Sequence, residues 1–183
     1  MKADVIHNLV DISGVLKKEF EKSHGNYSKA LVTVHTNDRI DTLPVIWENA
    51  REIEAGTPVS IMGEIRRYGK LENDYKQFIL IREIEILPEV KYENWIYLSG
   101  TLREFINSTD FSIEVKRASY ERVTDYISCY AYRSNRKELC KIPKGEKIVI
   151  TGKVRARTFL KKTAENPKGE ERKIVEVEIE AII

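Results

Sequence analysis

Residues 8–16 read NLVDISGVL, and residues 94–102 read NWIYLSGTL. Both stretches open with an asparagine and carry a Ser-Gly pair at the same place. Apolar residues recur at every second position in both, which is the pattern of a β-strand that buries one face. The recurrence of this stretch indicates that the chain contains an internal repeat.

Two further landmarks recur in the same order. Residues 56–66 (GTPVSIMGEIR) match residues 145–155 (GEKIVITGKVR), and in each the glycines are seven positions apart. Residues 83–86 match residues 178–181 with the same alternation. A join near residues 87–91 is too short for a flexible tether, so we expect the two repeats to lie close together.

Each half contains five strand-like runs and one helix-like run. The helix-like runs lie near residues 48–54 and residues 134–140, between the third and fourth strands. This order is typical of an oligonucleotide-binding (OB) barrel, whose closure removes exposed sheet edges. We therefore expect an all-β protein made of two tandem five-stranded OB-fold barrels, residues 1–88 and residues 91–183. A single β-sandwich is the alternative, but it does not explain a helix signal in both halves.

The composition is that of a soluble globular protein, with 42% hydrophobic and 33% charged residues in 183. No apolar run suggests a signal sequence, and none approaches the ~18 residues that cross a bilayer. We expect a cytoplasmic protein without a membrane partner. Cys129 and Cys140 have no second cysteine pair and no histidine at metal spacing, so we expect free thiols, no metal and no cofactor.

The two halves differ in charge. Residues 1–90 hold 12 Lys and Arg against 15 Asp and Glu, whereas residues 91–183 hold 19 against 14. The net charges are therefore −3 and +5, and the second half is the basic one. A mild excess of this kind often marks only a solvated surface.

Four stretches of the second half follow one another in a characteristic order. Residues 94–102 are followed by residues 124–132 (TDYISCYAY), and then by residues 152–159 (GKVRARTF) and residues 174–177 (IVEV). In motif and order they resemble the opening strand, the aromatic strand and the last hairpin of the bacterial and phage single-stranded DNA-binding protein family. The resemblance covers most of the second half and implies an OB fold that binds single-stranded DNA.

The first half departs from the family pattern, because Thr42 stands where the family has its first aromatic residue. After Ile183 there is no long segment with the acidic tip of that family, so we expect no recruitment of partners through such a tail. In this respect the chain is also similar to the primosomal single-strand-binding relatives.

Binding single strands without sequence preference requires flat aromatic faces for the bases and cations for the phosphates. Period two in residues 124–132 places three tyrosines on the face opposite a small apolar set. A basic hairpin with one phenylalanine follows, and the first half has a counterpart. The candidate nucleic-acid-binding residues are Tyr126, Tyr130, Tyr132, Arg155, Arg157, Phe159, Lys161, Lys162, Arg66, Arg67 and Tyr68.

Each candidate also has a structural interpretation. An outward tyrosine on a strand can serve cross-strand packing or a protein interface, and a basic hairpin tip can simply be solvated. Trp47 falls in phase with Leu43 and Val45, so we interpret it as a packing residue. Asp41 and Asp125 recur at equivalent strand starts, where we expect turn-capping roles and no catalytic pair.

The sequence therefore predicts non-catalytic, sequence-independent binding and protection of single-stranded DNA in replication, recombination or repair. An enzyme is not expected, because the histidines are isolated and no nucleophile or phosphate-loop motif occurs. The alternative is a protein-interaction OB module, an adaptor in a replication or primosome-type assembly. RNA stays open as a ligand, since nothing in the sequence reports on contacts to the 2′-OH. We expect a homodimer that assembles four OB barrels.

Overall fold

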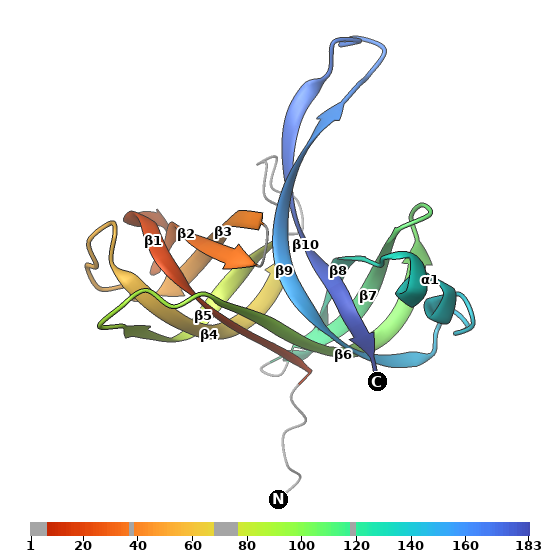
Figure 1. The fold of residues 1–183 in the computed structure, drawn as a ribbon, viewed down its shortest axis with the longest axis horizontal. Coiled ribbons are helices and arrows are strands. Elements are labelled where there is room, and N and C mark those ends of the chain that lie inside the picture. Colours follow the sequence, from red (N-terminus) through yellow and green to blue (C-terminus); the bar gives the residue numbers. More distant parts are fainter. Residues whose placement is uncertain (1–6, 37–38, 68–76, 118–119) are drawn as a thin grey trace, which may run out of the picture.

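The computed structural model describes residues 7–36, 39–67, 77–117 and 120–183. Within them the chain forms ten strands and one short helix (Figure 1). No helix of this described part is long and apolar enough to cross a membrane. The elements are β1 (Asn8–His24), β2 (Tyr27–Thr36), β3 (Arg39–Glu48), β4 (Pro58–Arg67), β5 (Gln77–Ile86), β6 (Glu93–Phe105), β7 (Asp110–Arg117), β8 (Tyr120–Tyr130), α1 (Arg133–Leu139), β9 (Lys147–Lys161) and β10 (Glu170–Ile182).

The strands of each half pair in a closed circuit. In the first half β1 pairs with β2, β2 with β3, β3 in parallel with β5, β5 with β4, and β4 again with β1. In the second half β6, β7, β8, β10 and β9 follow the same order. The strand order thus repeats, as the internal repeat predicts.

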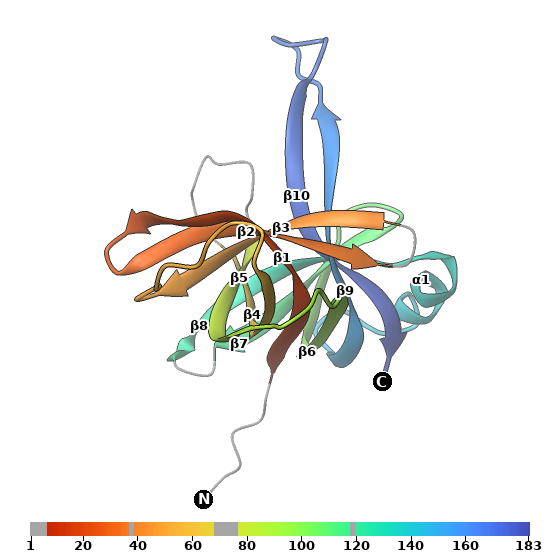
Figure 2. The same ribbon diagram turned by 60° about the vertical axis from the view of Figure 1, so that its left-hand side comes forward.

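The two circuits are joined edge to edge through their first strands. Residues 8–13 of β1 pair antiparallel with residues 93–98 of β6, so that all ten strands form one hydrogen-bonded sheet. The two halves lie on either side of this seam, while the β9–β10 hairpin projects away from both (Figures 1 and 2).

The buried faces of the opening strands are those that the alternation predicts. All six in-phase apolar side chains are fully buried, and each half contributes three of them to the core. They are Val10, Ile12, Leu16, Ile96, Leu98 and Leu102.

Glycine at the middle of each opening strand is required by a close approach of two strands. A Cβ on Gly14 would lie 2.1 Å from the carbonyl oxygen of Thr33, and one on Gly100 would lie 2.4 Å from that of Glu114. Near Gly14, β1 stops pairing with β4 and begins to pair with β2. The glycine therefore lets one strand cross between two partners, in agreement with the coiling that its position predicts.

The helix predicted in the second half is confirmed, and the one predicted near residues 48–54 is wrong. α1 covers Arg133–Leu139, whereas residues 50–54 form a loop without helix. The connection from β3 to β4 has only nine residues, 49–57, and includes positive φ at Asn49 and Gly56. It is too short for a helix with a turn at each end, and its one buried side chain, Ile53, packs in the core without one.

The closing strands match in a different register from the one that the sequence suggests. Gly63 pairs with Ile81 and Gly152 with Ile179, so these two isoleucines are equivalent. The sequence match had set Ile179 against Ile84, three positions away. Alternation repeats every two residues and both hairpins carry a bulge, so alternation alone does not set the register.

Two buried aspartates hold the halves together reciprocally. Asp41 accepts a hydrogen bond from the backbone N–H of Ala156 (3.0 Å), and Asp125 accepts one from that of Arg67 (3.3 Å). Their exposed fractions are only 1% and 3%. Each also pairs with an arginine of its own half, Arg39 of β3 at 2.8 Å and Arg117 of β7 at 2.8 Å. Asp41 lies within β3 and Asp125 within β8, so the turn-capping role stays a prediction.

Asp125 makes the stability of the protein depend on pH. Burial alone would raise its pKa, but hydrogen bonds from Arg117 and Arg66 outweigh burial, and the pKa lies below its usual value of 3.8. A carboxyl whose pKa is lowered by folding stabilises the protein above its unfolded-state pKa. That contribution is lost as the pH falls through the folded-state pKa.

We expect the substitution Asp125→Asn to lower the free energy of unfolding at pH 7 by about 3–5 kcal/mol, because two arginines lose their shared buried carboxylate. The difference from wild type should shrink in acid, where the wild-type carboxyl is itself protonated. Urea unfolding at pH 7 and at about pH 3 measures both effects. Glu85→Gln, at an exposed position of β5, is the control, and equal stability of Asp125→Asn and wild type at pH 7 would contradict the prediction.

Candidate nucleic-acid interface

The tyrosines of β8 lie on one face, opposite the core. Tyr126 is 47% exposed and Tyr132, just beyond the end of the strand, is 60% exposed. Between them Tyr130 is half-buried. Cys129 is fully buried on the other face, and burial, followed by the charge of Glu176, raises the pKa of its thiol well above the usual value. The alternation predicted for this strand is therefore confirmed.

Tyr130 is held from two sides. The guanidinium carbon of Arg155 lies 3.7 Å from the centre of its ring, and the ring of Tyr132 lies 5.7 Å away in an edge-to-face arrangement. Both geometries are attractive, because the π-face of a ring is negative and its edge positive. Tyr130 and Tyr132 thus form a rigid aromatic corner at the end of β8.

Arg155 contacts Tyr130 of this corner and two carboxylates of β10. Only 9% of the residue is exposed. Its Nε donates to Glu176 (2.7 Å) and its Nη1 to Glu178 (3.2 Å). Its charge is therefore neutralised locally, and the geometry is that of a support for Tyr130.

Arg157 shares the same buried carboxylate. Its Nε donates to Glu176 (2.7 Å) and its Nη2 approaches Asp110 (3.3 Å), while 38% of the side chain stays exposed. Burial would lower the pKa of Arg157, but the hydrogen bond that it donates to Glu176 and the negative charges of Glu176 and Asp110 raise it. This arginine is a charged group at the edge of the aromatic face.

The β9–β10 hairpin carries the remaining candidates of the second half. Phe159 is 38% exposed and pairs across the hairpin with Arg172. Lys161 and Lys162 are exposed, and neither has an ion pair within the described residues. Because the hairpin projects beyond the rest of the molecule (Figure 2), these lysines are available to an external anion.

The counterparts in the first half are not gathered into an equivalent surface. Arg66 is only 4% exposed and pairs with Glu64 and Asp125. Arg67 crosses to the second half, where its Nη1 donates to the carbonyl oxygen of Tyr126 (3.0 Å). Tyr68 lies outside the described residues. The structure therefore places Arg67 at the start of the tyrosine row.

Sequence reasoning missed contacts at the junction of the halves. Gln77 of β5 donates to the carbonyl oxygen of Val175 (2.8 Å) and accepts from the backbone N–H of Ser128. Arg117 pairs with Asp125 through two hydrogen bonds of 2.8 Å. Neither residue belongs to a repeated motif, so no local signal could have found them.

Trp47 packs as predicted. Its ring lies 5.3 Å from that of Phe20 in an edge-to-face arrangement, and both rings pack against the buried core of the first half. The guanidinium of Arg51 covers it at 5.9 Å from the ring centre.

A second exposed aromatic position lies at the seam between the halves. Trp95 of β6 is 40% exposed and Met62 of β4 is 42% exposed. Both pair with Asp11 of β1, one from each side, so the two side chains flank it on the sheet. Burial, and then the charge of Glu93, raises the pKa of Asp11. The sequence analysis did not single out this surface.

The structure is similar to two solved structures of the single-stranded DNA binding protein from Thermus aquaticus. A deletion variant of that protein superposes with a TM-score of 0.70 at 15% sequence identity, over 96% of this chain and 93% of that one. The wild-type protein superposes with a TM-score of 0.67 at 16% identity, over 96% and 91%. No family model and no curated protein matches the sequence.

The likeness establishes the fold of the chain. It covers both halves together, so the arrangement of the two circuits is shared as well as each circuit. The sequence resemblance is confirmed at the level of the fold: the chain has the fold of a single-stranded DNA-binding protein.

We expect Arg155→Gln to lower the free energy of unfolding by about 2–3 kcal/mol, because Glu176 loses a buried charged partner. The matched control is Arg172→Gln, which breaks an exposed pair with Glu170 and should cost less than about 1 kcal/mol. Urea unfolding of the two variants provides the comparison. If Arg155 served only as a contact for an external phosphate, both variants would be equally stable.

Proposed function

We propose that the chain binds single-stranded DNA without sequence preference and protects it in replication, recombination or repair. In this proposal each closed circuit is an OB barrel, residues 1–88 and residues 91–183. The observation that carries the proposal is the row of tyrosines on the outer face of β8 beside a projecting hairpin with unpaired lysines. A protein that only docks other proteins has no need of that combination.

The bases are bound by stacking. Tyr126 and Tyr132 offer accessible ring faces, and each stacked base contributes ~1–3 kcal/mol whatever its identity. Tyr130, held by Arg155, adds a rigid edge between them. Since every base has a π-face, this arrangement explains binding without sequence readout.

The phosphates are bound mainly by the hairpin. Arg155 and Arg157 are largely neutralised by carboxylates, so the row itself has little excess positive charge. Lys161 and Lys162 supply the free cations, and Phe159 beside them offers a further ring. The affinity should therefore fall with salt, with a slope of about −0.7 for each phosphate contact.

We expect the double substitution Tyr126→Ala with Tyr132→Ala to weaken binding of an oligo-dT of about 35 nucleotides by tenfold or more, because two stacking contacts are lost. Fluorescence anisotropy at several salt concentrations measures the affinity, with duplex DNA and RNA of matched length as further ligands. Tyr92→Ala is the control, since Tyr92 is exposed to a similar extent (42%) outside β8. Absence of binding by the wild type even at low salt would favour the protein-docking alternative.

We also propose that the chain forms a homodimer with four OB barrels. Trp95 and Met62 form an exposed apolar pair on a sheet face that strands of both halves share. Two copies of such a face bury each other in a symmetric contact.

We expect Trp95→Glu to convert a dimer to a monomer at micromolar concentration, because it places a charge in the apolar contact. Sedimentation equilibrium measures the mass. Ile106→Glu introduces the same charge at an exposed turn residue (61%) and should leave the dimer intact. A wild-type protein that sediments as a monomer at these concentrations would disprove the dimer.

A further inference from the structure

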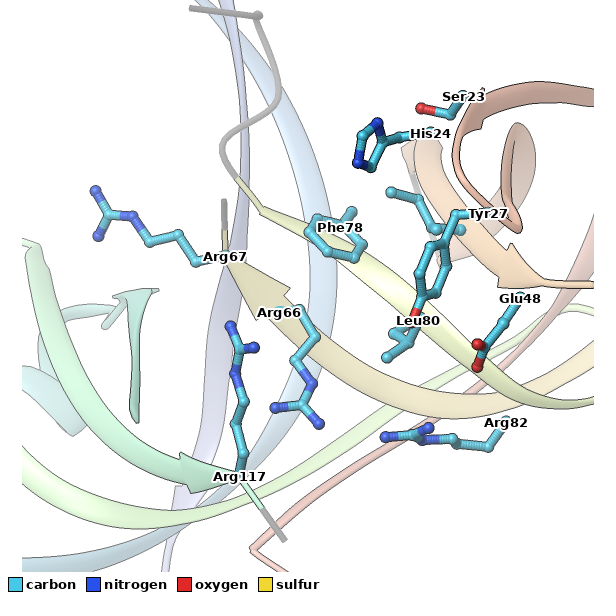
Figure 3. A pocket seen from close by; sticks show the side chains of 11 residues that line it. Ser23, His24, Tyr27, Glu48, Arg66, Arg67, Phe78, Leu80, Arg82 and Arg117 are labelled. Atoms are coloured by element: carbon cyan, nitrogen blue, oxygen red, sulfur yellow. The ribbon is translucent and has the colours of Figure 1, made fainter. Parts of the chain in front are cut away.

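A pocket of about 510 Å³ opens in the first half, at its junction with the second. Strands β1 to β5 supply most of its wall, and Arg117 of β7 closes it from the other half. Figure 3 shows Arg117 beside Arg66, with Tyr27 on the opposite side and Phe78 between. None of the tyrosines of the row lines the pocket. The two are neighbours, because Arg67 lines the pocket and donates a hydrogen bond to the carbonyl oxygen of Tyr126.

The wall of the pocket is positively charged and held in place. Arg82, Glu64, Arg66, Asp125 and Arg117 form a chain of alternating ion pairs that runs from the first half into the second. Three arginines against two carboxylates leave one excess positive charge. The planar guanidinium groups, fixed in this way, match the geometry of a phosphate.

One buried donor within this series of ion pairs has no partner among the described residues. Arg66 is 4% exposed, and its Nε finds no hydrogen-bond acceptor among the described residues. An unsatisfied buried N–H is unfavourable, so an external acceptor that reached it would be bound favourably. Because Arg66 lines the pocket, a phosphate or base oxygen inside the pocket is such an acceptor.

The opposite side offers an aromatic surface. Tyr27 of β2 is 38% exposed, and Phe78 lines the pocket beside it. Pockets that bind small ligands have volumes of about 300–1,000 Å³. The observed volume therefore suits a single nucleotide, with its base against Tyr27 and its phosphate against the arginines.

We propose that this pocket binds one nucleotide of the same DNA strand that crosses the tyrosine row. The proposal rests on the proposed function and extends it to the first half, where this chain has Thr42 in place of the aromatic residue of the family pattern. The strand then passes from the row, over Arg67, into the pocket. Both halves hold the strand, and the first half contributes more than a scaffold.

The test uses two substitutions in the full chain, each with a matched control. Tyr27→Ala removes the stacking face, and Tyr92→Ala is its control at a similar exposure. Arg82→Gln removes an arginine whose side chain is 45% exposed and pairs with Glu64. Its control, Arg103→Gln, breaks the similar pair of Arg103 (47% exposed) with Glu114 outside the pocket.

We expect Tyr27→Ala and Arg82→Gln each to weaken binding of the oligo-dT by about tenfold, while both controls bind like wild type. Only Arg82→Gln should reduce the salt slope, by about 0.7, because it alone removes a phosphate contact. Ultraviolet cross-linking of an oligonucleotide with 5-iodouracil, followed by mass spectrometry, should identify Tyr27. Thermal unfolding of all four variants verifies that they are folded.

The outcomes separate this inference from the function on which it rests. If the wild type binds the strand but both pocket variants bind like their controls and Tyr27 does not cross-link, the pocket inference is wrong and the proposed function stands. If the wild type does not bind single strands at all, both fail. A third arm uses free dTMP: saturable binding that Tyr27→Ala abolishes, with unchanged affinity for the strand, would assign the pocket to a free nucleotide and overturn the proposal.

Discussion

The structure depends on two buried carboxylates, one in each half, and each accepts a hydrogen bond from the other half. Asp41 and Asp125 accept backbone N–H groups across the junction, and a buried charge without such partners is strongly unfavourable. Their reciprocal contacts therefore specify one relative position of the halves. Because the start of the tyrosine row and the pocket both lie at this junction, their geometry is set by the same contacts.

Three arginines show how burial changes the partner that a positive charge binds. Arg66, Arg155 and Arg157 read as phosphate contacts in the sequence, yet each pairs with carboxylates in the structure. Arginine suits this purpose, because its planar group binds several acceptors and stays charged when buried. In the interface proposed for the second half, attraction for phosphates therefore falls to exposed lysines of the hairpin, and stacking is the larger contribution.

The repeat and its faces could be predicted, but three features could not. The connection at residues 49–57 overlaps the run that the sequence predicts as helix, and it is nevertheless a loop because it is too short. The register of β10 depends on a bulge between Ile179 and Ala181, which alternation does not reveal. The exposed pair formed by Trp95 and Met62 arises only when β6 and β4 flank β1.

The sequence by itself determined the order of the strands along the chain, the buried and outward faces, and the row of tyrosines. These follow from period-two alternation and from glycine placement, which act over a few neighbouring residues. Only the tertiary structure decided that Arg155 supports Tyr130, that Arg66 and Arg117 share Asp125, and that a pocket forms between the halves. Those contacts join residues that lie far apart in the chain, and they exist only after the strands have paired.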